Sequence, residues 1–254
     1  MNAFADWAPA VYAGSAWVLP VLFAVTFHEA AHGYAALRFG DDTARRAGRL
    51  SLNPLRHVDT FGTIVLPALL ILLRSPFLFG YAKPVPVDFS RLNRPRRDMV
   101  WVALAGPGTN VLLAIVAGLL FTLGKIVGLF EGPLGNPWVL LNAGLDQLPP
   151  GAPAWIAKNL ANAWIINALL CVFNLLPLPP LDGGRVAVGL LPDALAFPLA
   201  RLEPLGIPIL LLLIFLLPYV GSQFGLELNI FGLLIAVPAE LLIRFVLAIT
   251  GHPG

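Results

Sequence analysis

The chain has 254 residues, of which 58% are hydrophobic and only 12% are charged, and its formal net charge is +2. Soluble globular domains are nearer to half apolar and a quarter charged, so this composition excludes an ordinary soluble protein and predicts a polytopic membrane protein. A charge so close to neutral gives no sign of nucleic-acid binding, and the placement of the charges along the chain is more informative than their sum.

Five apolar segments are long enough to span a bilayer, which takes about 20 helical residues. They are residues 13–38, 98–124, 155–177, 204–221 and 229–250. A further apolar run, Phe61–Leu73, is interrupted by Pro67 and is too short to span comfortably. We therefore expect an all-α polytopic membrane protein with about five to six transmembrane helices. No loop has room for another folded domain, so residues 1–254 should form a single integral-membrane domain.

Most of the 16 Lys and Arg residues lie in three loops, over residues 38–56, 74–97 and 185–201. By the positive-inside rule these loops are cytoplasmic, which puts the N-terminus outside and the C-terminus inside, with Arg244 towards the cytoplasmic end of the last span. Residues 61–90 should then enter and leave the membrane from the same side. The expected structure of 61–90 is a re-entrant, partly extended segment resembling a β-hairpin.

The first span carries the most informative motif, His28-Glu29-Ala30-Ala31-His32, within a long apolar run. On a helix, H-E-x-x-H places two imidazoles one turn apart on one face and a carboxylate beside them. Ionisable groups in a membrane helix are costly, so they form a functional-site hypothesis by default. The pattern predicts two ligands of a catalytic zinc and a general base that acts within the bilayer.

A catalytic zinc needs a third protein ligand, and the residues alone offer Asp182, His57 and Asp59. Asp182 follows a proline-rich stretch at the end of the third span and precedes two glycines, so the chain can turn sharply there. With the orientation above, the first and third spans both run inward, which brings the HEAAH motif and Asp182 to a similar depth. The competing interpretation is that Asp182 only caps the next helix.

Together these motifs resemble the site-two protease family of intramembrane zinc metalloproteases, in its compact bacterial branch without PDZ or CBS domains. The family pairs H-E-x-x-H with N-x-x-P-x-x-x-L-D-G, and here Asn174 to Gly183 matches the second motif. The resemblance extends over most of the chain. It includes Asn53-Pro54-Leu-Arg-His57-Val-Asp59, Phe79-Gly80-Tyr-Ala-Lys-Pro-Val-Pro-Val and Ala105-Gly106-Pro107-Gly-Thr-Asn110.

The resemblance implies one Zn²⁺ per chain, bound by His28, His32 and Asp182, with Glu29 as general base. It implies that Asn174, and also Asn110, contact the substrate peptide or the developing oxyanion. The implied activity is hydrolysis of peptide bonds within or near transmembrane segments of single-span substrates, in the bacterial inner membrane. The oligomeric state stays open, as does the choice between anti-sigma factors and leftover signal peptides as substrates.

Two further segments each allow more than one role. In Lys83-Pro84-Val85-Pro86-Val87, an extended strand would leave the amides of Val85 and Val87 free on one edge to pair with unwound substrate. The alternative is a polyproline-like turn that only closes the re-entrant segment. His57 and Asp59 form a ligand-orienting pair, a substrate gate, or an interfacial polar pair near Arg56.

Two other classes of function compete with the protease. A membrane metal transporter or binder would also use intramembrane His and Asp residues, but it gives no reason for Glu29 beside His28. A catalytically inactive scaffold that binds helices would need neither the ligands nor the base, and all of these are present. The residues therefore favour the zinc endopeptidase.

Overall fold

The computed structural model describes residues 3–65, 69, 83–144, 147–149 and 151–253. Within them, five helices are long and apolar enough to cross a membrane, which confirms the five predicted spans. They cover Val11–Arg38, Pro95–Ile126, Ala152–Asn174, Glu203–Gln223 and Gly232–Ile249. The described part contains helices, turns and extended coil but no β-strand, in agreement with the expected all-α class.

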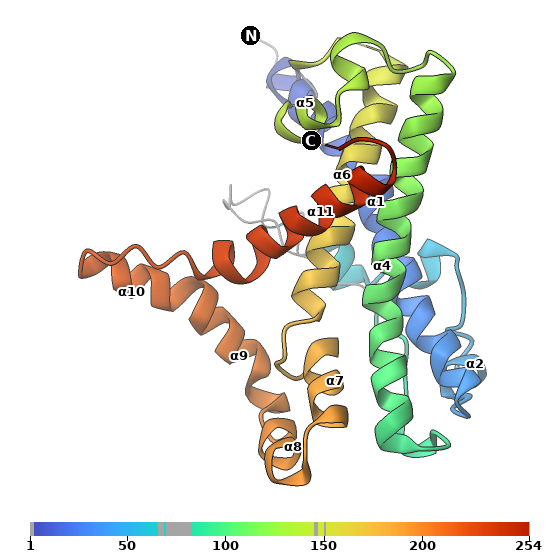
Figure 1. Cartoon of the computed structure of the whole chain (residues 1–254), viewed down its shortest axis with the longest axis vertical. Coiled ribbons are helices and arrows are strands. Elements are labelled where there is room, and N and C mark those ends of the chain that lie inside the picture. Colours follow the sequence, from blue (N-terminus) through green and yellow to red (C-terminus); the bar gives the residue numbers. More distant parts are fainter. Residues whose placement is uncertain (1–2, 66–68, 70–82, 145–146, 150, 254) are drawn as a thin grey trace.

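Three long helices form the body of the molecule (Figure 1): α1 (Ala3–Arg38), α4 (Pro95–Ile126) and α6 (Ala152–Asn174). The shorter helices are α2 (Thr43–Arg46), α5 (Pro137–Asn142), α7 (Asp182–Leu190) and α8 (Asp193–Ala200). The fourth span joins α9 (Gly206–Leu211) to α10 (Leu217–Gln223) through a π-helical turn, Leu212–Leu216. The fifth begins with another such turn, Gly232–Ala236, and continues as α11 (Val237–Ile249). One-turn 3-10 helices cover Pro54–Arg56, Phe89–Arg91, Gly132–Gly135 and Glu203–Leu205.

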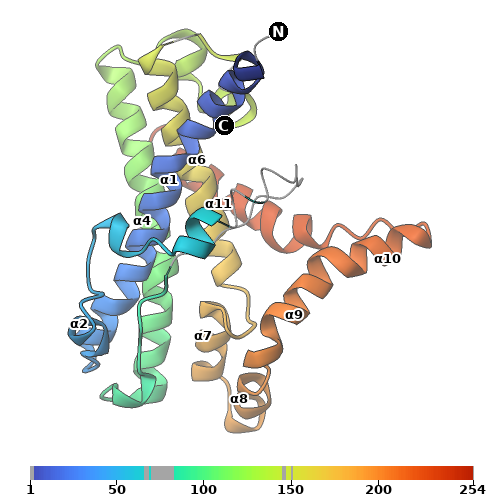
Figure 2. The same ribbon diagram turned by 180° about the vertical axis from the view of Figure 1, so that it is seen from behind.

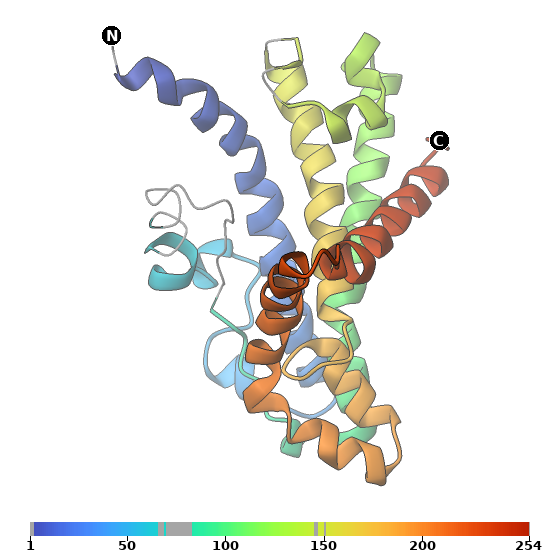
Figure 3. The ribbon, with the colours of Figure 1, turned by 90° about the vertical axis from the view of Figure 1, so that its left-hand side faces the viewer.

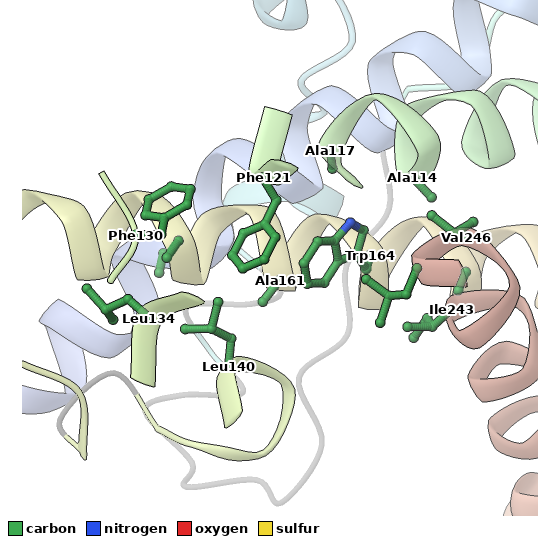
Figure 4. Packing of buried hydrophobic residues seen from close by; sticks show 14 of the residues in the cluster. Ala114, Ala117, Phe121, Phe130, Leu134, Leu140, Ala161, Trp164, Ile243 and Val246 are labelled. Atoms are coloured by element: carbon green, nitrogen blue, oxygen red, sulfur yellow. The ribbon is translucent and has the colours of Figure 1, made fainter. Parts of the chain in front are cut away.

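Small residues let the central helices approach closely. Helix α6 buries a row of alanines at helical spacing, Ala154, Ala157, Ala161 and Ala168, as is typical of helix contacts in membranes. Between α4 and α6 lie the rings of Phe121 and Trp164, edge to face with centroids 5.3 Å apart, and Val246 of α11 joins the same cluster (Figure 4). This core fixes α4 and α6 as a rigid pair.

Polar side chains tie α1 to this pair. The Asn162 amide on α6 donates to the Ala16 carbonyl at 3.0 Å, and the Trp155 indole donates to Ser15 Oγ at 2.9 Å. The first turns of α1 lean away from α4 and α6, and the rest of the helix runs beside them (Figure 3). The HEAAH motif lies in that second part, where α1 packs on α4.

The two ends of the molecule differ (Figure 1): α2, α7 and α8 lie at one end, with α5 and both termini at the other. At the C-terminus, His252 Nε2 lies 2.9 Å from Thr122 Oγ1, and its ring packs edge-on against Phe121 near the end of α4. The charge pattern predicted the termini on opposite sides of the membrane. That assignment of sides stays a prediction, and it agrees with an odd number of crossing helices.

Only part of the predicted re-entrant segment, residues 61–90, lies within the described chain. A π-helical turn covers Thr60–Val65, and residues 83–88 are extended without pairing into a sheet. Residues 66–68 and 70–82 are outside the described residues. The extended stretch runs beside the end of α1 and the beginning of α4 (Figure 2).

Candidate metal centre

His28 and His32 lie one turn apart on α1, as the HEAAH spacing predicts, and both side chains face α4. Their ring centroids are 4.7 Å apart at an interplanar angle of 83°, and their Nε2 atoms approach to 3.1 Å. His28 is buried and His32 is half-buried. Two imidazole nitrogens therefore converge on one point beside α4.

Asp182 brings a third donor atom to the same point. Its Oδ2 atom lies 3.3 Å from Nε2 of His28 and 3.3 Å from Nε2 of His32. Of the three candidates for the third ligand, Asp182 joins the two histidines, and His57 and Asp59 do not belong to the group. The N-cap of α7 is Leu181, and the Asp182 carboxylate faces the imidazoles, so capping is not its only role.

The local sequence explains how Asp182 reaches α1. Helix α6 ends at Asn174, and the proline-rich stretch that follows cannot continue it. Any Cβ added at Gly183 or Gly184 would overlap backbone atoms of residues 175–179. Only glycines therefore allow the first turn of α7 to pack directly on this loop, which holds Asp182 at the level of the histidines.

The hydrogen bonds of the two imidazoles define their tautomers. His32 Nδ1 lies 2.7 Å from the Val102 carbonyl, which can only accept, so Nδ1 carries the proton. His28 Nδ1 lies 2.7 Å from Asn110 Oδ1. The Asn110 amide nitrogen donates to Asn167 Oδ1 at 2.9 Å and to the Ala24 carbonyl at 3.3 Å, so its oxygen must face His28. In its neutral form each imidazole then presents a bare Nε2 lone pair to Asp182.

Three acceptor atoms that meet without a hydrogen between them call for a cation. Asp182 Oδ2 is buried and has no hydrogen-bond partner, which is costly unless a positive charge lies beside it. Donor atoms bound to one tetrahedral zinc at 2.0–2.1 Å are about 3.3–3.4 Å apart. The observed separations of 3.1 and 3.3 Å are close to that value. The residues therefore fit a zinc ion and leave a fourth position for water.

Gly106 on α4 makes room for the two imidazoles. A Cβ added there would lie 2.6 Å from His28 Cε1 and 2.7 Å from His28 Nε2, and closer still to His32 Nε2. Sequence reasoning quoted Gly106 only as part of a motif and missed this role. Gly106 and Asn110 are four residues apart and so share a helix face, which was the available signal.

Glu29 lies beside the centre and is half-buried. Its Oε2 atom accepts the Val85 backbone N–H at 2.8 Å. The prediction that the Val85 amide stays free to pair with substrate is therefore wrong for this structure. Gly33, one turn further along α1, provides the space: a Cβ there would lie 2.9 Å from Val85 Cγ1.

The two asparagines predicted to contact substrate differ in their surroundings. Asn110 is fully buried and its amide contacts His28, Asn167 and Ala24, while its contact with substrate stays a prediction. Asn174 is half-buried at the end of α6, where its amide nitrogen donates to the Leu170 carbonyl at 3.0 Å.

His57 and Asp59 support the neighbouring loop. His57 is buried, its Nε2 lies 2.7 Å from the Ser51 carbonyl, and its own carbonyl accepts the Lys83 N–H at 2.9 Å. Asp59 Oδ1 accepts the Gly62 N–H at 2.7 Å at the start of the π-helical turn. His57 is therefore linked to the extended segment that reaches Glu29.

A His/His/Asp centre with an adjacent carboxylate, inside a polytopic helical membrane protein, is the arrangement of a membrane-embedded metallopeptidase. The family description Peptidase family M50 matches residues 16–217. YwhC of Bacillus subtilis (strain 168), provisionally named a zinc metalloprotease, is 38% identical over 196 residues, which are 77% of this chain and 78% of YwhC. No solved structure is significantly similar to the chain.

Two mycobacterial relatives, both called Rip2 and also provisionally named zinc metalloproteases, are longer than the matched region. The Mycolicibacterium smegmatis protein is 30% identical over 162 residues, 64% of this chain and 52% of that protein. The Mycobacterium tuberculosis H37Rv protein is 32% identical over 178 residues, 69% of this chain and 58% of that protein. The chain thus spans little more than half the length of the Rip2 proteins.

The chain belongs to Peptidase family M50. It is a multi-pass intramembrane zinc metalloprotease that works in the lipid bilayer on membrane proteins, with zinc as its cofactor. The two competing classes, a metal transporter and an inactive scaffold, are not favoured.

Proposed function

We propose that His28, His32 and Asp182 hold a single zinc ion, and that Glu29 is the general base of peptide-bond hydrolysis. When bound, zinc supplies a Lewis acid that lowers the pKa of a water molecule towards neutrality and polarises the substrate carbonyl. The observation that carries the proposal is the meeting of three hydrogen-free acceptor atoms, two Nε2 and one Oδ2, within 4.8 Å of one another next to Glu29.

The proton transfers belong to Glu29. Its position next to His28 supports a role in taking the proton of the attacking water and returning it to the leaving peptide nitrogen. Because Oε2 already accepts the Val85 N–H, Oε1 is the oxygen left for the proton. Asn174, at the end of the helix that leads to Asp182, is proposed to donate its amide to the developing oxyanion. This requires Asn174 to exchange its bond to the Leu170 carbonyl for one to substrate.

Asn110 and Val102 are proposed to act on the ligands rather than on the substrate. Each accepts the Nδ1 proton of one imidazole and so keeps Nε2 available for the metal. Such partners of ligating histidines affect metal affinity nearly as strongly as the ligands themselves.

Several finer proposals concern the membrane. We propose that residues 1–254 act as a single domain in the bacterial inner membrane, that residues 61–90 are re-entrant, and that the substrates are single-span proteins. The arginine-rich loops at the end that holds α2, α7 and α8 are proposed to be cytoplasmic, with the N-terminus outside. The five crossing helices, an odd number, support a cytoplasmic C-terminus on the side opposite the N-terminus. Protease protection of terminal tags tests this, and two tags protected from the same side would reject it.

The catalytic proposal is tested with purified full-length protein in detergent. His28→Ala should lose both bound zinc and cleavage of a tagged transmembrane reporter, and Glu29→Gln should lose cleavage while it keeps zinc. The matched control is Glu240→Gln, the same chemical change on the exposed face of α11, which should change neither quantity. Full turnover by Glu29→Gln would reject the base, and stoichiometric zinc in His28→Ala would reject the ligand set.

A further inference from the structure

The extended residues 83–88 are held tightly at their first residue. The Lys83 N–H donates to the His57 carbonyl at 2.9 Å, and the Lys83 carbonyl accepts from Arg49 Nη2 at 2.8 Å. The same Arg49 guanidinium also donates to the Arg56 carbonyl. One side chain therefore links this end of the segment to the loop that contains His57.

The last residue of the segment is held by a buried carboxylate. The Asp88 N–H donates to Asp41 Oδ2 at 2.8 Å. Asp41 is fully buried, and its other oxygen accepts the backbone N–H of Thr43 at 2.9 Å and the Thr43 hydroxyl. A carboxylate that is itself fixed from several directions makes a rigid anchor, since it has little freedom to follow a moving partner.

Between these anchors the only residue that reaches the catalytic centre is Val85. Its side chain is buried and lies against the Cα atom of Gly33, and its N–H donates to Glu29 Oε2 at 2.8 Å. Pro84 and Pro86 have no N–H to give. Among the described residues, the Val87 N–H has no acceptor. Between its two anchored ends the segment thus presents a single engaged amide, which donates to the general base.

We propose that residues 83–88 form a fixed strap whose Val85 amide positions the Glu29 carboxylate for proton transfer. The inference deepens the proposed function and rests on Glu29 as its base. A glutamate side chain has several rotatable bonds, and a base must be held within a fraction of an ångström of its productive place. One hydrogen bond to Oε2 removes most of that freedom and turns Oε1 towards the centre. Val85 is then a positioning residue, and its bound amide is not an edge for substrate.

The strap is tested without any activity measurement by hydrogen exchange of the full-length zinc protein in detergent. A peptide over residues 83–88 reports mainly the amides of Val85, Val87 and Asp88, because proline has none. Electron-transfer fragmentation then assigns the exchange to each amide. Val85 should be slow and Val87 fast. Glu29→Ala should make Val85 fast, and Glu29→Gln, which keeps an acceptor oxygen, should leave it slow. Fast exchange of the Val85 amide in the unmodified protein, or an exchange rate that Glu29→Ala does not change, overturns the proposal.

Kinetics with a matched pair of substitutions tests the positioning role. Val85→Pro removes the N–H, and Val85→Ala keeps the N–H while it removes the two Cγ methyl groups. Cleavage of the transmembrane reporter by Val85→Pro should have a kcat about tenfold or more below that of Val85→Ala, at equal zinc content. The two KM values should agree within about twofold. A raised KM with an equal kcat would identify the segment as a substrate edge and overturn the proposal.

These results separate the strap from the proposed function. If Glu29→Gln keeps full turnover, the general base is wrong, whatever the exchange of Val85 shows. If Glu29→Gln is inactive but the two Val85 variants have equal kcat and KM, the base stands and the strap is rejected.

Discussion

Replacing Gly106 with alanine should disrupt the metal centre through a single methyl group. A Cβ at this position would lie 2.6–2.7 Å from two atoms of the His28 ring, whereas ordinary contacts begin at 3.4 Å. The ring must therefore move by about 0.7 Å, and zinc sites tolerate about 0.2 Å in their ligand distances. His28 and His32 cannot yield freely, because each Nδ1 is fixed by a 2.7 Å hydrogen bond. We expect zinc retention to weaken at least about 100-fold, or about 2.7 kcal/mol.

The assay is competition for zinc between the purified protein and a chelator of known affinity, with bound zinc measured by mass spectrometry. The control is Gly108→Ala on the same helix, where an added Cβ would meet no atom within 4 Å. Both changes favour the helix by about 1 kcal/mol, so general helix stability cannot separate them. Gly108→Ala should retain zinc like the unmodified protein. Equal zinc retention by the two alanine variants would refute the steric argument.

Other predictions concern the surroundings of the centre. Asn110→Ala removes the acceptor of His28 Nδ1 and should weaken zinc retention about 10–100-fold in the same competition, with Asn110→Asp restoring most of it. Burial opposes ionisation of Asp41 and so raises its pKa. Hydrogen bonds from Thr43 and from the Asp88 amide of the strap, together with the charge of Arg91, outweigh burial, so the pKa of Asp41 is lowered overall. The stability that Asp41 adds is therefore present above its unfolded pKa and is lost as the pH falls through the lower folded value. Hydrogen exchange of the Asp88 amide should become faster over the same pH range. Asp41→Asn should flatten this pH dependence of the exchange rate. Lys158→Met leaves two carbonyls at the end of α5 without a donor and should cost about 1–3 kcal/mol of unfolding free energy, seen as a lower Tm.

The ligands on α1 could be predicted from sequence because their geometry is local. Residues four apart on a helix always share a face, so His28 and His32 converge whatever the rest of the fold does. Asp182 is a harder case, since its position depends on how α6 ends and α7 begins. Prolines and glycines in the intervening loop predicted a sharp turn, but the residues alone could not choose it over His57 or Asp59. The family motif made that choice, and the structure brings the three atoms together.

The supporting contacts escaped prediction because they join segments with no fixed spacing. Asn110 was assigned to the substrate as a polar residue in a motif, and only the packing of α4 on α1 reveals that it accepts from His28. The Val85 amide was predicted to be free because prolines flank it. The pattern was correct that only one edge of the segment, the edge with the N–H groups of Val85 and Val87, can donate hydrogen bonds. Nothing in that pattern indicates that Glu29, on a distant helix, occupies this edge.

Arg244 shows where charge counting loses its physical basis. The positive-inside rule works on solvated charges in loops near the ends of spans. Arg244 was counted towards the cytoplasmic side, but its guanidinium pairs with Glu240 and lies 5.1 Å from the ring centroid of Trp138, next to α5. A cation that is neutralised by one neighbour and stacked on another contributes little to the loop bias. Its contacts, together with that of His252 on Thr122, hold the two ends of α11 against α5 and the end of α4.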